Sequence, residues 1–289
     1  MLYVFLSICC SVIVSILLKL AKRYQIDVFQ AITWNYSMAV VLTWIFLKPQ
    51  LQNLHASPIY IYTALGILLP LLFMVIALCI RFNGIVRTEV AQRLSLFIPI
   101  IAAFLIFGES LSMLKIIGIS IGFIAIICSI PWKNKTSPNK KSAPNAWIHL
   151  FIVFVGFGLI DILFKQMALY KAVPYMASLF MVYLIAFVLS LLVLVYRFGA
   201  KKAKFSWPHI LFGWILGIAN FGNILFYIKA HQALAKNPST VFSAMNIGVI
   251  VLGALVGFFI FKEKLSLLNK IGIALAVVSI IVISYANIF

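Results

Sequence analysis

Acidic side chains are few in this sequence, and one of them interrupts a long apolar segment. Of the five acids in 289 residues, only Asp161 lies well inside such a segment, with Lys165 four positions later. An ionisable residue within a membrane helix is energetically costly, so it should face a cavity or a partner. The spacing of four places both side chains on one helix face, where they can form an ion pair. We interpret Asp161 and Lys165 as gating or coupling residues, and leave open whether they take part in proton coupling or only neutralise each other.

Amide and aromatic side chains that can form hydrogen bonds recur in the other apolar segments. Asn220 and Asn223 are three residues apart and project from one helix face, next to Gly217 and Gly222. Their amides can bind a polar substrate or a neighbouring helix, and both interpretations stay open. Arg93 can bind a carboxylate or extend to the membrane interface. The predicted substrate-binding residues are Asn35, Tyr36, Gln92, Arg93, Tyr183, Asn220, Asn223 and Asn246.

The composition is typical of a membrane protein. Apolar residues make up 65% of the chain and charged residues 10%, whereas a soluble domain has about 45–50% and about 25%. The apolar runs approach the ~20 residues that cross a hydrocarbon core as a helix. We therefore predict an all-α polytopic protein of the cell (inner) membrane, embedded in the lipid bilayer.

The formal charge of +18 does not indicate a nucleic-acid partner. Its lysines and arginines lie in small groups between apolar runs, which is typical of the loops that orient membrane proteins. The four cysteines and four histidines show no metal-binding spacing. We expect no metal, no cofactor and, without a clustered acid motif or a nucleophile arrangement, no enzyme.

Ten membrane spans are expected, each bounded by charged residues, prolines or polar clusters. A segment with three prolines and four lysines, residues 131–147, separates the fifth span from the sixth. We predict one repeat in residues 1–130, this linker, and a second repeat in residues 148–289. The spans are Leu2–Leu20, Gln30–Leu47, Ile59–Ile80, Thr88–Phe107, Leu114–Ile130, Ile148–Met167, Tyr175–Tyr196, His209–Ile228, Thr240–Phe261 and Ile271–Ile288.

The two halves are related by an internal repeat. The stretch from Phe107 to Ile119 matches Phe261–Ile273 at eight of thirteen positions, including Glu109 and Glu263. Each glutamate stands just before a span, where its carboxylate can stabilise the N-terminus of the helix that follows. Since five helices is an odd number, the second half should enter the membrane upside down, as an inverted-topology repeat.

Equivalent positions outside these turns are also recognisable. Lys19 is the equivalent of Lys165 and is grouped with it as a gating or coupling residue, although Ser15 replaces the acid there. Gln92 and Asn246 are likewise equivalent, each seventeen residues before the glutamate of its half. Such a pair can offer the same hydrogen-bonding groups on two sides of a cavity.

Positive charge is distributed unevenly between the two ends of the predicted spans. When each Lys or Arg is assigned to its nearest connection, odd-numbered connections hold seventeen and even-numbered ones hold six. The positive-inside rule then places the odd-numbered connections in the cytoplasm and both termini on the opposite side.

These features resemble the drug/metabolite transporter superfamily, and most closely its ten-helix EamA-type members. The resemblance covers the whole chain and is most specific at the paired Phe-x-Glu-x-Leu-Ser turns around Glu109 and Glu263. It implies a basket of helices around a central cavity, and transport of a small-molecule substrate such as an amino acid or a nucleoside. It also implies termini in the cytoplasm, which disagrees with the charge distribution.

The function expected from these observations is secondary transport, with a small polar metabolite exported by alternating access. The alternative is a flippase for a lipid-linked substrate, which would need a cavity open to the lipid. The sequence leaves open whether the protein is a monomer or a homodimer.

Overall fold

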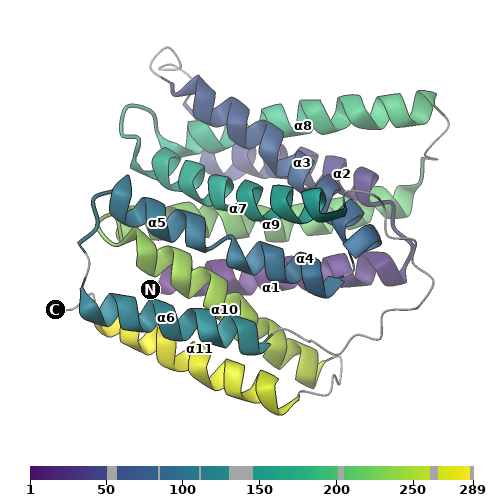
Figure 1. Cartoon of the computed structure of the whole chain (residues 1–289). Helices are drawn as coiled ribbons and strands as arrows, with labels where there is room; N and C mark the ends of the chain where they lie inside the picture. Colours follow the sequence, from purple (N-terminus) through teal and green to yellow (C-terminus); the bar gives the residue numbers. More distant parts are fainter. Residues whose placement is uncertain are drawn as a thin grey trace.

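The chain folds into a layered bundle of α-helices, here described from a computed structural model (Figure 1). The structure describes residues 1–50, 57–83, 85–110, 112–129, 146–200, 205–260 and 266–286. Most of the predicted linker and the turn around Glu263 lie outside these residues. The helices are α1 (Leu2–Arg23), α2 (Val28–Leu42), the π-helical η1 (Thr43–Leu47), α3 (Ile59–Asn83), α4 (Ile85–Leu94), α5 (Phe97–Leu105), α6 (Met113–Ser129), α7 (Ala146–Leu169), α8 (Tyr175–Gly199), α9 (Trp207–Ala233), α10 (Pro238–Phe259) and α11 (Leu267–Tyr285).

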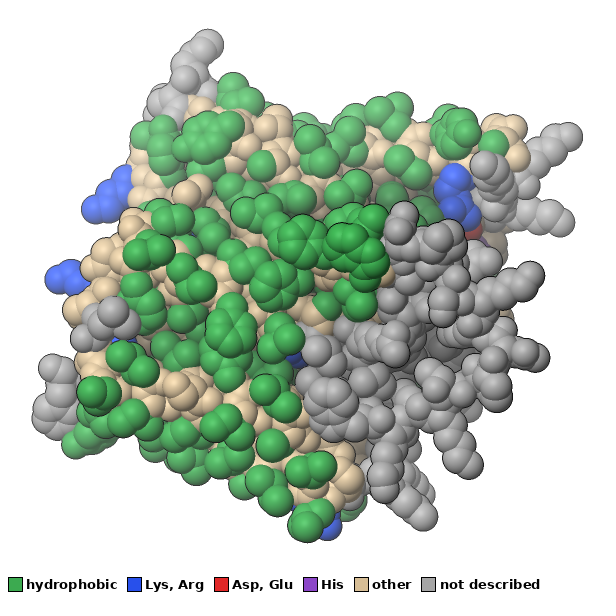
Figure 2. Space-filling view, in the orientation of Figure 1, with side chains coloured by type: hydrophobic (Ala, Val, Ile, Leu, Met, Phe, Trp, Pro, Cys, Tyr) green, Lys and Arg blue, Asp and Glu red, His purple; other side chains and the backbone are tan. Residues whose placement is uncertain are grey.

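The bundle carries its apolar residues on the outside as well as in the core. Large side chains such as Leu105, Phe46 and Leu192 are exposed, and Figure 2 shows hydrophobic side chains spread over the whole described part of one face. A water-soluble monomer rarely exposes a continuous apolar surface of this kind, whereas a lipid-facing surface requires one. The prediction of an all-helical membrane protein is therefore supported.

The prediction of ten spans is met only in part. Among the described residues, five helices are long and apolar enough to cross a membrane, namely Ile59–Ile76, Trp147–Leu169, Tyr175–Gly199, Trp207–Ala233 and Pro238–Phe259. The other apolar segments are shorter: Leu2–Leu18, Ala91–Leu105, Met113–Cys128 and Leu267–Ile283.

The fourth predicted span, Thr88–Phe107, is not one continuous helix. It is divided into α4 and α5 by a break at Ser95 and Leu96. Pro99 lies four residues after Ser95, and a proline ring inside a helix clashes with the carbonyl group four residues earlier. Pro99 therefore belongs to the first turn of a new helix, where a proline is tolerated.

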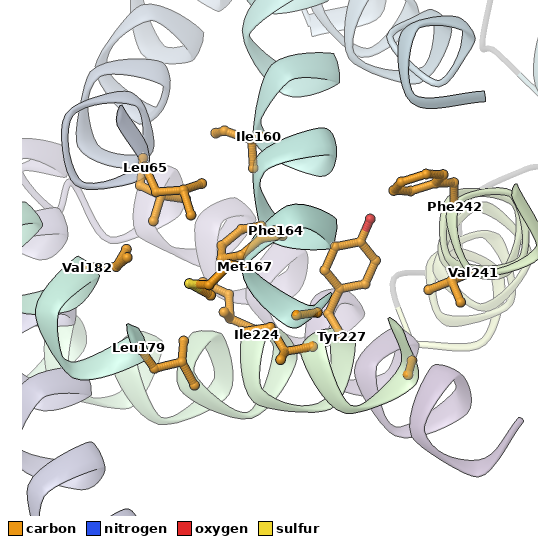
Figure 3. Close-up of a cluster of buried hydrophobic side chains, with 14 of the residues drawn as sticks. Leu65, Ile160, Phe164, Met167, Leu179, Val182, Ile224, Tyr227, Val241 and Phe242 are labelled. Atoms are coloured by element: carbon orange, nitrogen blue, oxygen red, sulfur yellow. The ribbon is translucent and has the colours of Figure 1, made fainter. Parts of the chain in front are cut away.

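One large hydrophobic core joins helices from both halves of the chain. It includes Leu65 of α3, Phe164 of α7, Val182 of α8 and Phe242 of α10, all buried. In Figure 3, Leu65 and Val182 lie on one side of Phe164, and the ring of Tyr227 of α9 lies on the other side, toward Phe242. The core thus includes residues of α7 and α9, which carry four of the eleven predicted site residues: Asp161, Lys165, Asn220 and Asn223.

Candidate functional site

Four predicted substrate-binding residues lie on α2 and on two helices that pack against it, α8 and α9. Asn35 and Tyr36 are on α2, Tyr183 on α8 and Asn220 on α9, and all four are buried. The ring of Tyr183 lies 6.4 Å from that of Phe221, the neighbour of Asn220, measured between centroids.

Each of these four side chains carries a buried hydrogen-bonding atom that the described residues leave unpaired. Four buried atoms have no hydrogen-bond partner among the described residues: Asn35 Oδ1, the hydroxyl oxygens of Tyr36 and Tyr183, and Asn220 Nδ2. Buried polar groups in native proteins are nearly always paired, because an unpaired one costs about 1–3 kcal/mol. A polar ligand between α2, α8 and α9 would remove this cost.

Other predicted binding residues already have partners or lie elsewhere. Asn223 Oδ1 accepts a hydrogen bond from Ser7 Oγ of α1 at 2.9 Å. Asn246 Nδ2 donates to the Phe242 carbonyl of its own helix at 3.0 Å. Gln92 and Arg93 are on α4, which packs against α7 and α3. Among the predicted binding residues on α2, α8 and α9, Asn35, Tyr36, Tyr183 and Asn220 thus each keep an atom without a hydrogen-bond partner in the described part of the chain.

Asp161 and Lys165 lie on α7 as expected, but each side chain binds a different group. The Tyr227 hydroxyl donates to Asp161 Oδ1 at 2.8 Å. Lys165 Nζ donates to the Ala235 carbonyl at 2.8 Å and to the His231 carbonyl at 3.4 Å. The expected ion pair between the two side chains is not formed, because the free carbonyl groups at the C-terminus of α9 attract the ammonium group instead. Lys19 is on α1, and its side chain lies outside the described residues.

Glu109 stabilises a helix N-terminus, but not that of the helix that follows it. Its Oε2 accepts from the backbone N–H of Ser239 at 2.8 Å, in the first turn of α10. Its Oε1 accepts from Ser239 Oγ at 2.6 Å and from Lys115 Nζ at 2.9 Å. Lys115 Nζ also donates to Asn237 Oδ1 at 3.0 Å. Glu109 therefore contacts α6 through the Lys115 side chain, but the backbone N–H group that it caps belongs to α10.

Several residues of these sites were not singled out from the sequence, among them Tyr227, His231 and Ser239. His231 is fully buried, has no hydrogen-bond partner for either ring nitrogen among the described residues, and lies 4.6 Å from Tyr227 and 4.8 Å from Phe242 between ring centroids. A signal was present, since Asn220, Asn223, Tyr227 and His231 follow helical spacing on one face of α9. Within the described ranges, no three His, Cys, Asp or Glu side chains are grouped so that they could hold a metal ion.

The fold and its exterior define an all-helical membrane protein with polar groups buried among its helices. The chain is 42% identical to a Haemophilus influenzae protein described as uncharacterized, over 292 residues that cover 97% of each chain. It belongs to the same family as that protein. No family model matches the sequence.

A solved crystal structure has the same overall fold. It superposes with a TM-score of 0.73 over 99% of this chain and 96% of that chain, at 14% sequence identity. At this identity the similarity extends to the arrangement of the helices, and not to the chemistry of the site.

Proposed function

We propose that this protein is a secondary transporter that exports a small polar metabolite by alternating access, as expected of a drug/metabolite transporter of the EamA type. The observation that carries the proposal is the set of buried polar groups on α2, α8 and α9 that have no hydrogen-bond partner among the described residues of a membrane protein. Two of these helices belong to one predicted half and the third to the other. Secondary transporters bind their substrates near the middle of the membrane, at the interface between two repeats.

The helix contacts support an architecture of two related halves, residues 1–130 and 148–289. Under the sequence repeat, each helix of the first half has an equivalent in the second half. The pairs are α1 and α7, α2 and α8, α3 and α9, α4 with α5 and α10, and α6 and α11. The contact of α2 with α9 then has its counterpart in α8 with α3, and that of α1 with α9 in α7 with α3. If α4 and α5 together form one crossing and the shorter helices also cross, each half has five spans.

One pair of close contacts illustrates this equivalence. A Cβ atom on Gly66 of α3 would lie 3.4 Å from the Val182 carbonyl oxygen and 2.5 Å from Ile185 of α8. A Cβ atom on Gly217 of α9 would lie 2.7 Å from the Asn35 carbonyl oxygen and 2.7 Å from Met38 of α2. In both cases the glycine contacts two residues of its partner helix that are three positions apart, the first of them through its carbonyl oxygen.

The directions of equivalent helices favour an inverted repeat. Thr33 Oγ1 of α2 donates to the Ser190 carbonyl of α8 at 3.2 Å, whereas Trp44, further along the chain, lies 5.5 Å from the earlier Phe180 between ring centroids. The α2 segment and α8 therefore run antiparallel. The same holds for α6 and α11, whose opposite directions are visible in Figure 1. Equivalent helices would run parallel if the two halves had the same topology.

A transport assay on the purified protein tests the proposal. We expect one or more metabolites from a broad panel to raise its unfolding temperature in detergent, because a ligand that binds only the folded state stabilises it by mass action. The same metabolites should be taken up by proteoliposomes that contain the protein, faster than by protein-free liposomes. Absence of both effects for every solute, with movement of a labelled lipid-linked compound between leaflets, would replace this proposal with a flippase.

Asp161 and Lys165 are part of the proposal as coupling or gating residues. If Asp161 carries a coupled proton, Asp161→Asn should abolish uphill uptake driven by a pH gradient. Exchange between equal concentrations on both sides should continue, because it needs no net proton transfer. Unchanged pH-driven uptake by Asp161→Asn would remove this residue from the coupling mechanism.

A further inference from the structure

One end of the bundle is held together by polar side chains that join the two halves. At this end α5, α7 and α9 finish and α6, α8 and α10 begin, and the α5–α6 turn lies beside the α9–α10 turn (Figure 1). Glu109 accepts hydrogen bonds from the backbone N–H and the hydroxyl group of Ser239, at 2.8 and 2.6 Å. Lys115 donates to Glu109 at 2.9 Å and to Asn237 at 3.0 Å. We call these four residues the Glu109 network.

The Glu109 network is shielded from solvent and includes full charges. The side chains of Glu109 and Lys115 are 0% and 4% exposed, and Ser239 is buried. Hydrogen bonds to an ionised group are roughly twice as strong as those between neutral groups, and burial strengthens them further. Three of the hydrogen bonds cross from residues 1–130 to residues 148–289. The two halves cannot separate at this end without breaking all three.

The α9–α10 turn is also held by Lys165, which we proposed above for gating or coupling. Lys165 Nζ donates to the carbonyl group of Ala235 at 2.8 Å, two residues before Asn237 of the Glu109 network. The ammonium group lies 5.9 Å from the centroid of the Phe107 ring, in the turn that carries Glu109. The α9–α10 turn thus contacts one buried lysine from each half, so its movement would change the contacts of both halves at once.

The sequence repeat does not supply the same ammonium group at the opposite end. Lys115 is six residues after Glu109, whereas the residue six positions after Glu263 is Asn269. The side chain of Asn269 is neutral, and its Oδ1 accepts a hydrogen bond from the backbone N–H of Ser266 in its own turn at 3.2 Å. The repeat therefore offers Glu263 no counterpart of Lys115.

The hydroxyl group of Ser239 has no counterpart in the repeat either. Gln92 and Asn246 are equivalent positions, and the residues seven positions before them are Ile85 and Ser239. An aliphatic side chain therefore stands where the second half has a hydroxyl group. By sequence alone, two of the partners that hold Glu109 exist for one of the two repeat turns and not for the other.

We propose that the Glu109 network is a latch that keeps the transport pathway closed at this end, and that the protein rests in this closed state because the repeat does not provide an equal latch at the other end. The inference rests on the proposed transport function and names residues that control it. Alternating access opens one end at a time, as one half rocks against the other. A contact made in only one of two states shifts the equilibrium toward that state.

Cysteine accessibility tests the latch without any substrate. Ser243 is buried one turn after Ser239 on α10, and its hydroxyl group has no hydrogen-bond partner among the described residues, so Ser243→Cys is a conservative reporter. Lys171→Cys, exposed in the α7–α8 turn, identifies whether intact cells or everted membrane vesicles present the latch end to the medium. A membrane-impermeant maleimide is added to each preparation. Mass spectrometry measures labelling at position 243, so the four native cysteines can stay.

Opening the latch should admit the reagent from this end. Glu109→Gln with Lys115→Met removes both buried charges and leaves neither unpaired, so the protein should fold. We expect labelling at position 243 to become at least about tenfold faster from the latch end, the loss of one charge-assisted hydrogen bond. Labelling from the opposite end should not become faster. An unchanged rate would overturn the latch, and so would an equal increase from both ends, which general loosening of the fold would produce.

A milder variant keeps the test decisive if the double variant does not fold. Ser239→Ala removes the hydroxyl group and leaves the ion pair between Glu109 and Lys115 in place. We expect labelling at position 243 from the latch end to become at least about twofold faster. A folded Ser239→Ala protein with an unchanged rate would also overturn the latch.

The ion pair between Asp27 and Arg197 provides a matched control. It also joins the two halves, at 3.7 Å, but at the opposite end, where α2 begins and α8 finishes. Asp27→Asn again replaces an acid by its amide, and it should leave labelling at position 243 from the latch end within about twofold. An increase as large as that of the double variant would show that any break between the halves has this effect, and would overturn the latch.

Proteoliposome uptake separates failure of this inference from failure of the proposed function. Uptake of a solute together with unchanged labelling in the double variant would reject the latch and retain the transporter. Faster labelling from the latch end, with no solute of any class bound or taken up, would support an interface that opens at this end and reject the transporter.

Discussion

Glu109 connects two parts of the chain that are 130 residues apart in the sequence. Its carboxylate and the ammonium group of Lys115 are both almost fully buried, at 2.9 Å. The carboxylate also receives two hydrogen bonds from Ser239 at the start of α10. Removing one member of a buried ion pair is more harmful than removing both, because it leaves one buried charge without its partner.

We expect Glu109→Gln to lower the free energy of unfolding by about 3 kcal/mol, and the double change with Lys115→Met to restore a large part of it. Unfolding of the purified protein in detergent, followed by tryptophan fluorescence, measures both. Asp27→Asn is the matched control, because Asp27 also caps a helix and pairs with Arg197 across the halves, at 3.7 Å and partly exposed. It should cost less than about 1 kcal/mol. Equal effects of the two changes would contradict the role given to Glu109.

The partners of Asp161 and Lys165 lead to a second expectation at the same scale. Asp161→Asn and Tyr227→Phe should show a coupling energy of about 1 kcal/mol in a double-mutant cycle of stability, because the two side chains share a hydrogen bond of 2.8 Å. Asp161→Asn and Lys165→Met should be additive within about 0.5 kcal/mol, since the two side chains bind different groups. Strong coupling between Asp161→Asn and Lys165→Met would instead indicate that the two side chains form the ion pair expected from their spacing.

At the scale of elements, close approach of helices determines which glycines the fold needs. A Cβ atom on Gly217 would meet the carbonyl oxygen of Asn35 at 2.7 Å, and a backbone atom cannot rotate away. A Cβ atom on Gly253 of α10 would meet no atom within 4 Å. Both glycines are inside long helices, so they differ mainly in what surrounds them.

Gly217→Ala should therefore destabilise the protein by about 1–3 kcal/mol, as overpacking does in other cores. Gly253→Ala should be neutral or stabilise by up to about 1 kcal/mol, because alanine favours the helix. Unfolding temperatures of the two variants, measured side by side without ligand, test this. A Gly217→Ala protein as stable as Gly253→Ala would show that α2 and α9 are less closely packed than described.

At the scale of the whole molecule, burial of two lysines changes the charge balance between the two ends. Lys115 and Lys165 were counted with the even-numbered connections, but both are buried. Their removal leaves four basic residues on that side against the seventeen assigned to the other. These two lysines therefore add little to the positive charge of the even-numbered connections, which the charge distribution places outside the cytoplasm.

Reporter fusions measure the orientation directly. A reporter that is active only in the cytoplasm should be active after Lys140 and inactive after Phe289, if the charge asymmetry sets the topology. A reporter active only outside the cytoplasm should give the reverse result at both positions. Activity of the cytoplasmic reporter at Phe289 would instead agree with the termini implied by the family resemblance.

The sequence by itself determined the class of protein and most helix positions, because long apolar runs leave the backbone no alternative to a helix in a membrane. It also identified the repeat through the turns around Glu109 and Glu263, and five of the ten predicted spans as helices long enough to cross. The division of the fourth span followed from Pro99, whose effect is local and could have been anticipated. These features depend on residues close together in the chain.

Only the tertiary structure decided which polar groups meet. Spacing along α7 suggested that Asp161 pairs with Lys165, but α9 supplies Tyr227 to one and free carbonyl groups to the other. Spacing likewise suggested that Glu109 caps the helix after it, whereas packing brings the N-terminus of α10 to it. Hydrogen bonds and ion pairs act over a few ångströms, so their partners depend on how helices pack across the two halves, which the order of residues does not specify.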